Sequence, residues 1–185
     1  MKTQKRSRGF TLIELLLVLS ILTLVQAWVV PALAEMVDAA RVNSAAQALS
    51  ESLMRARSEA IKRNGRVVVC KSSTGASCEA QAEWEQGWIV FHDDNNNAAL
   101  DADESVLYRE VTLGSSLRLS GNTPVRDYVS YTPYGRTKMS SGAFQAGTFT
   151  VCARRGKVEF ARQVVISAGG RARVAKAAAS KCDSG

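Results

Sequence analysis

The stretch RGFTLIELLLVLSIL, residues 8–22, decides how this 185-residue chain folds. It opens an apolar segment, residues 10–34, in which Glu14 is the one ionisable residue. At 1.5 Å per residue, a helix of this length spans roughly 37 Å, which is enough to cross the ~30 Å hydrocarbon core of a bilayer. Residues 1–9 contain four bases and no acid, a pattern that keeps an N-terminus cytoplasmic. We therefore expect one membrane-spanning helix with the remainder of the chain in the periplasm.

Two cleavage sites flank this segment. Ala32-Leu33-Ala34 is typical of a secretory signal peptide, but the apolar run is longer than the usual ~7–15 residues. A cut between Gly9 and Phe10 instead gives Phe10 a free amine about one helical turn from Glu14. An ionisable residue within a membrane segment usually marks a functional position. In an assembly, Glu14 of one subunit would neutralise the amine of its neighbour and set the register.

These residues resemble the class III signal of type IV pilins and pseudopilins. The match consists of a short basic leader, Gly9 before the cut, Phe10 after it, and Glu14 as the fifth mature residue. The resemblance implies cleavage by prepilin peptidase between Gly9 and Phe10 and N-methylation of Phe10. It also implies a single-pass inner-membrane precursor that joins other pilins or pseudopilins in a filament reaching the cell surface. It leaves open which filament.

The helical pattern continues beyond the membrane segment. Pro31 is expected to kink or loosen the helix because it removes one backbone hydrogen bond. Asn64-Gly65 is typical of a helix C-cap. We expect one helix of about 55 residues, whose second half packs on a sheet through an apolar stripe. The stripe consists of Val42, Ala46, Leu49, Leu53, Ala56 and Ala60. The predicted organisation is a leader (1–9), a membrane half-helix (10–34), an amphipathic half-helix (35–64) and a β-rich periplasmic domain (65–185).

After Gly65 the pattern changes to short β-rich runs separated by turn residues. Strands that follow one another without alternating helices predict antiparallel sheets and an α+β fold. The order of elements resembles the GspH/FimT group of minor pseudopilins and minor pilins, with VVVC (67–70), GWIVFHDDNNN (87–97) and GGRAR (169–173) as the matching stretches. The predicted strands are Arg66–Lys71, Gly87–His92, Ser105–Thr112, Ser116–Ser120, Tyr128–Tyr131, Thr148–Ala153, Lys157–Ile166 and Arg171–Ala175.

Four cysteines in an oxidising compartment predict disulfides. They allow three pairings. We expect Cys70–Cys78 across a polar turn and Cys152–Cys182 between a strand and the basic tail. The spacings contain no C-x-x-C knuckle of the kind that binds zinc, and no cofactor is expected.

The acidic stretch from Asp93 to Glu104 has two interpretations. Asp93, Asn95, Asn97, Asp101 and Glu104 have the spacing of oxygen ligands in an EF-hand calcium loop. Alanine stands at position 98 where that loop has its turn glycine, and strand-like runs flank the segment instead of helices. A polar connection between two strands explains the same residues without a metal, and the sequence leaves the choice open.

The charge distribution points to an anionic partner. The chain carries +7 overall, of which residues 152–185 contribute +6. Gly170-Arg171-Ala172-Arg173 resembles the G-R-x-R motif of FimT-type minor pilins, a family associated with DNA binding during natural transformation. On an extended segment Arg171 and Arg173 point to one side, where guanidinium groups can grip phosphates. The other bases predicted to join the DNA-binding surface are Arg154, Arg155, Lys157, Arg162, Lys176 and Lys181.

The sequence predicts a binding and structural protein and not an enzyme. His92 is the one histidine, and the chain contains no nucleophile elbow and no phosphate-binding loop. The expected function is that of a minor type IV pilin that binds DNA without sequence preference for uptake. The alternative is a GspH-like minor pseudopilin of a type II secretion system with a structural role only.

Overall fold

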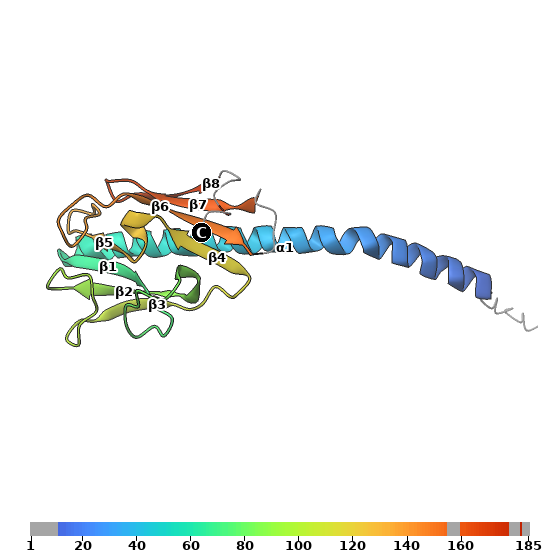
Figure 1. Ribbon diagram of the computed structural model, residues 1–185, viewed down its shortest axis with the longest axis horizontal. Coiled ribbons are helices and arrows are strands. Elements are labelled where there is room, and N and C mark those ends of the chain that lie inside the picture. The colour runs from blue at the N-terminus through green and yellow to red at the C-terminus, as the bar shows by residue number, and fades with distance from the viewer. Residues whose placement is uncertain (1–10, 155–159, 178–181, 183–185) are drawn as a thin grey trace, which may run out of the picture. The chain divides into compact units, whose positions relative to one another are not determined.

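The structure is a computed structural model that describes residues 11–154, 160–177 and 182 (Figure 1). Helix α1 runs without interruption from Leu12 to Arg63 and continues through Pro31, as expected for one long helix. The chain divides into two compact units, one up to Val37 and one from Asp38 onward. Within α1, an apolar stretch of mean hydropathy 2.3 is long enough to cross a membrane.

The C-terminus of α1 is closed by the predicted cap. Asn64 adopts a positive φ of 49°, and the N–H of Gly65 donates to the carbonyl oxygen of Ala60 at 3.2 Å. The role of Gly65 is steric and not conformational. A Cβ atom at this position would overlap the imidazole ring of His92. A larger residue at this turn from helix into strand would therefore have to displace the His92 ring.

Two four-stranded antiparallel sheets follow the helix. The first sheet has the order β3-β2-β1-β5, with β1 Arg66–Lys71, β2 Trp88–Asp93, β3 Val106–Glu110 and β5 Tyr128–Tyr131. The second sheet has the order β4-β6-β7-β8, with β4 Leu117–Gly121, β6 Gly147–Ala153, β7 Arg162–Ile166 and β8 Ala172–Lys176. Short 3₁₀ helices at Trp84–Gln86 and Thr123–Val125 precede β2 and β5.

The apolar stripe of α1 forms the centre of the core. All six predicted stripe residues are completely buried, and they share one hydrophobic cluster with inward residues of both sheets. Trp84 packs edge-on against Phe149 of β6, with ring centroids 4.9 Å apart. A second, smaller cluster of Val68, Cys70, Ile89 and Phe91 fills the other face of the first sheet. The α+β prediction is therefore confirmed, with one helix packed on two antiparallel sheets.

The strand predictions differ from the structure mainly at their ends. Gly87 lies outside β2 because its φ is +125° and its Cα lies against the carbonyl of Glu110. The predicted strand at Lys157–Ile166 begins only at Arg162, and residues 157–159 lie outside the described residues. Pattern alone cannot place such ends, because turn geometry decides where pairing stops.

Candidate functional site

The N-terminus of α1 is capped by its own side chains. The backbone N–H and the hydroxyl of Thr11 both donate to one carboxylate oxygen of Glu14, at 3.0 and 2.9 Å. The N–H of Glu14 donates to the Thr11 hydroxyl at 3.4 Å, which completes a capping box. The sequence analysis missed this local role, although the T-x-x-E spacing signals it. The predicted assembly role of Glu14 stays a prediction, and Gly9 and Phe10 lie outside the described residues.

Arg171 and Arg173 lie at the turn between β7 and β8. Both side chains are exposed. Ala172 and Val174 pack against the core, so Arg173 between them points away from it. The turn is closed by the N–H of Gly170, which donates to the carbonyl of Ser167 at 2.8 Å. The two arginines of the G-R-x-R motif therefore lie where a tight turn leads into the edge strand β8.

A contact between two glycines fixes this turn against the rest of the domain. Gly170 has a φ of +76°, and a Cβ atom there would overlap the carbonyl oxygen of Gly135 and lie 3.2 Å from the ring of Tyr131. Gly135 also has a positive φ, +70°, and its carbonyl oxygen accepts a hydrogen bond from Nε of Arg57 at 2.9 Å. The C-terminal end of α1, the β5–β6 loop and the β7–β8 turn thus meet at one end of the globular unit (Figure 1).

The structure does not gather the other predicted bases around this turn. Arg162 pairs with Lys176 across the hairpin, at the end away from the turn and on the opposite face from Arg173. Arg154 forms an ion pair with the buried carboxylate of Glu85 at 2.8 Å. The remaining three, Arg155, Lys157 and Lys181, lie outside the described residues.

Three residues that the sequence analysis did not select lie beside Arg171. Arg57 reaches Gly135 from α1, and Tyr134 and Arg136 flank Gly135 in the chain. We call Arg57, Tyr134, Arg136 and Arg171 the tip cluster. Residues 128–154 and 160–177 contain seven lysines and arginines and no aspartate or glutamate, so no carboxylate of these segments opposes the cluster. No sequence signal links its members, because three separate segments supply them.

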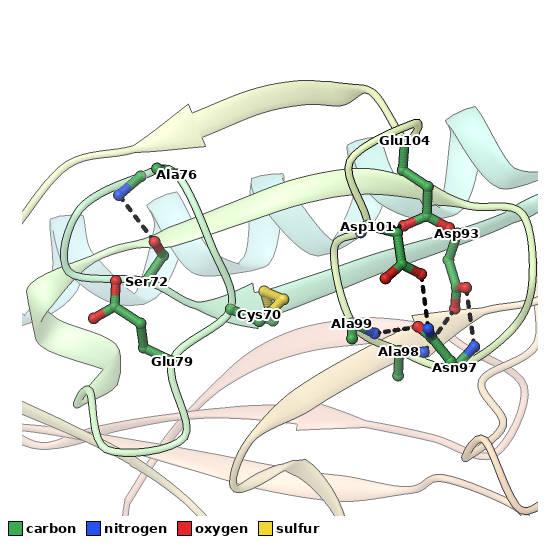
Figure 2. The surroundings of a disulfide bond; sticks show 12 residues. Cys70, Ser72, Ala76, Glu79, Asp93, Asn97, Ala98, Ala99, Asp101 and Glu104 are labelled. Carbon is green, nitrogen blue, oxygen red and sulfur yellow. Dashed lines mark hydrogen bonds between the residues drawn. A yellow bond between two sulfur atoms is a disulfide. The ribbon is translucent and has the colours of Figure 1, made fainter.

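Both predicted disulfides are present. Cys70–Cys78 has a Cα–Cα distance of 5.6 Å and joins β1 to the loop that follows it. Cys152–Cys182 has a Cα–Cα distance of 6.1 Å and ties the tail to β6. None of the four cysteines is free. The shorter bridge contributes to the second hydrophobic cluster, next to the acidic stretch (Figure 2).

The acidic stretch forms the connection between β2 and β3. Both carboxylate oxygens of Asp93 accept backbone hydrogen bonds, from Asn97 and Ala98, each at 3.1 Å. Asp93 is 1% exposed, and this burial raises the pKa of its carboxyl group, as does the nearby charge of Glu104. The Ala98 and Asn97 N–H groups act in the opposite direction. Asp93 therefore serves as an internal acceptor that shapes the turn.

Glu104 and Asp101 of this connection also have internal partners. Glu104 accepts the N–H of Asp94 at 2.8 Å and that of Asp101 at 3.1 Å. Asp101 accepts the side-chain amide of Asn95 at 2.7 Å. It also accepts the side-chain amide of Asn97 at 2.8 Å (Figure 2). Within the described part of the chain, no group of three His, Cys, Asp or Glu side chains is arranged to hold a metal ion. The geometry favours the polar-connection interpretation.

A calcium titration tests that interpretation. We expect calcium added to chelator-treated mature protein to leave its melting temperature unchanged, because a ligand that binds the folded state would raise it. Asp93→Ala should lower the free energy of unfolding by about 1–3 kcal/mol, since it leaves buried N–H groups without an acceptor. Scanning calorimetry measures both effects. A calcium-dependent rise in melting temperature that Asp101→Ala removes would restore the EF-hand interpretation.

Comparison with known proteins places this geometry in a family. The model of the family described as type II transport protein GspH matches residues 45–170, and that of the prokaryotic N-terminal methylation motif matches residues 4–25. No curated protein matches the chain. The crystal structure of the type IV minor pilin FimU of Pseudomonas aeruginosa strain PAO1 is similar at 20% identity and a TM-score of 0.52, covering 76% of this chain and 90% of FimU. The minor pseudopilin EpsH of the type 2 secretion system of Vibrio cholerae is similar at 13% identity and a TM-score of 0.50, covering 74% of this chain and 97% of EpsH.

A methylation motif on an apolar helix, followed by antiparallel sheets around the helix's second half, defines a type IV pilin-like protein. The chain belongs to the GspH family and is a minor pilin or pseudopilin of the GspH/FimT type. Membership implies anchoring in the membrane before assembly, processing by prepilin peptidase, and assembly with other pilins.

Proposed function

We propose that this protein joins a type IV pilus as a minor pilin and binds DNA without sequence preference for uptake in natural transformation. One observation carries the proposal, namely the placement of Arg171 and Arg173. Both are exposed at a fixed turn, in a part of the chain that has bases and no acids. Such a surface attracts the phosphate backbone, the part of DNA that carries no sequence information.

The spacing of the two arginines suits this partner. Two residues along an extended segment cover roughly 6.6 Å, so each guanidinium can contact a separate phosphate. The Gly135–Gly170 contact holds the turn in place, and a fixed turn loses less entropy on binding than a free tail does. The Cys152–Cys182 bridge adds a second constraint close to the same sheet.

The N-terminal features fit a route from membrane to filament. The four bases of residues 1–9 would keep the leader cytoplasmic and direct the globular unit to the periplasm, where disulfides form. Removal of the leader would expose the amine of Phe10, which is then methylated. Glu14 of one subunit would neutralise the amine of a neighbour in the filament. The role is structural and binding, without catalysis.

The alternative is a minor pseudopilin of a type II secretion system with no DNA partner. The family description and the likeness to EpsH in fold support it. The two functions differ in what is lost when the gene is deleted. A deletion strain that loses transformation but still secretes its exported enzymes supports the pilus function, and the reverse pattern supports the secretion function.

Complementation of that deletion strain makes the test residue-specific. The wild-type gene should restore transformation, whereas Arg171→Ala/Arg173→Ala should restore filament incorporation but not transformation. Arg109→Ala/Arg126→Ala, which removes two exposed charges from β3 and from the segment before β5, is the charge-matched control and should restore both. Full transformation with the Arg171→Ala/Arg173→Ala protein would reject the proposed role of this turn.

A further inference from the structure

Among the large apolar side chains that the structure describes in the globular unit, Tyr134 is the most exposed, with 87% of its surface accessible. It lies on a tight turn in which the N–H of Thr132 donates to the carbonyl of Arg136, and the N–H of Gly135 donates to the carbonyl of Thr132, both at 2.8 Å. Pro133 fixes the backbone just before it. A single exposed tyrosine is ordinary on a protein surface. This one differs because a rigid turn presents its ring to solvent.

Three arginines belong to the segments that meet at this turn. Arg57 donates to the carbonyl of Gly135, the residue next to Tyr134, and Arg136 is the following residue. Arg171 follows Gly170, whose Cα lies against the same carbonyl. The acid nearest to Arg57 along α1 is Glu59, and it is already paired with Arg63 at 2.6 Å and Lys62 at 3.7 Å. Three arginines and one exposed aromatic ring therefore lie on segments that meet at the same end of the domain.

A nucleic acid that offers both phosphates and an unstacked base would be complementary to this arrangement. Arginines contact the backbone, while an aromatic ring gains most from a base whose face is not already stacked. In a duplex the faces of internal bases are covered by their neighbours, so Tyr134 would add little there. We propose that Tyr134 stacks on an unpaired base, so that the tip cluster binds single-stranded DNA more tightly than duplex DNA. This inference rests on the proposed DNA-binding function and adds the form of DNA that the site prefers.

The preference can be measured as the ratio of the affinities for single-stranded and duplex DNA. Stacking of one base on an aromatic side chain typically changes affinity by about five- to 150-fold. We therefore expect the mature full-length protein in detergent micelles to bind a fluorescein-labelled oligothymidylate about tenfold or more tighter than a duplex of the same length. Tyr134→Ala should bring the ratio of the two affinities close to one, and Tyr134→Phe should keep it, because phenylalanine retains the ring. Melting temperatures of the variants show whether each remains folded.

Phe144→Ala is the matched control. Phe144 is 68% exposed in the same β5–β6 loop but is paired with Lys138 and lies outside the tip cluster, so the ratio should not change. Fluorescence anisotropy with both DNA forms separates the possible failures. If neither form binds, the DNA-binding function itself is wrong. If duplex binds and the single strand binds no tighter, or if Tyr134→Ala leaves the ratio as in wild type, the stacking proposal is overturned while the DNA-binding function stands.

Discussion

Replacing Gly9 with valine is expected to leave the nine-residue leader attached and to keep the protein out of filaments completely. The methylation motif spans residues 4–25, and prepilin processing in this family removes the leader before assembly. Insertion into the membrane should continue, because the apolar part of α1 is unchanged. Mass spectrometry of the membrane fraction measures processing, and immunoblots of sheared filaments measure incorporation.

Ala34→Val is the control for the rival cleavage site. It alters the A-x-A sequence that precedes Glu35 and should leave cleavage after Gly9 unchanged, so that the mature protein differs in mass only by the larger side chain of valine. The interpretation is contradicted if Ala34→Val blocks processing or if the mature protein begins at Glu35. The protein would then carry an ordinary signal peptide.

Because Glu14 also belongs to the capping box, a test of its assembly role needs a second variant that alters the cap but keeps the carboxylate. Glu14→Val removes both the cap and the carboxylate proposed to pair with the amine of a neighbouring subunit. Thr11→Ala removes the hydroxyl that both donates to Glu14 and accepts its N–H, and it leaves the carboxylate and the backbone N–H of residue 11. We expect both variants to be processed, Glu14→Val to fail in filament incorporation, and Thr11→Ala to be incorporated. Equal failure of the two would assign Glu14 to helix capping alone.

Gly170→Ala is expected to lower the free energy of unfolding by roughly 2–5 kcal/mol. About 1–2 kcal/mol comes from placing an L-residue at a φ of +76°, and a further ~1–3 kcal/mol from the overlap with the Gly135 carbonyl. Urea unfolding of the mature protein in micelles, followed by the fluorescence of the buried Trp84 and Trp88, measures the change.

Two other glycines separate these contributions. Gly142 has a φ of +84° but no atom within 4 Å of a new Cβ, so Gly142→Ala should lose only the backbone part. Gly169 has an ordinary φ, and its Cβ would meet only Ser167 Oγ at 3.8 Å, so Gly169→Ala should be nearly neutral. A loss at Gly170 no greater than the loss at Gly142 would show that the glycine contact does not hold the turn.

Much of the architecture follows from sequence patterns that depend on nearby residues. The spacing of Val42, Leu49 and Leu53 predicted their burial because helical periodicity alone decides which face is apolar. β1 and β5 begin and end at the predicted residues, since turn residues flank both runs. The pairing Cys70–Cys78 was predictable because the two cysteines lie eight positions apart across a polar turn.

The tip cluster was not predictable in the same way. Gly135 and Gly170 are far apart in the sequence, and only the packing of the β5–β6 loop against the β7–β8 turn brings Arg57 and Arg136 to Arg171. Tertiary contacts also determine which partners each basic side chain binds. Glu85 is distant in sequence from Arg154, so the sequence could not reveal that this predicted DNA contact also forms an ion pair within the protein.

The salt dependence of DNA binding tests the central claim most directly. Anisotropy of a labelled duplex, titrated with mature full-length protein over a range of salt concentrations, should show affinity falling steeply as salt rises. Arg171→Ala/Arg173→Ala should weaken binding to duplexes of any sequence and flatten the log–log slope by roughly 1.8, or about 0.9 per lost phosphate contact. Arg109→Ala/Arg126→Ala should keep the wild-type slope. Equal binding by wild type and the Arg171→Ala/Arg173→Ala protein, or no binding of any DNA at low salt, would contradict the DNA-binding function and leave a structural pseudopilin.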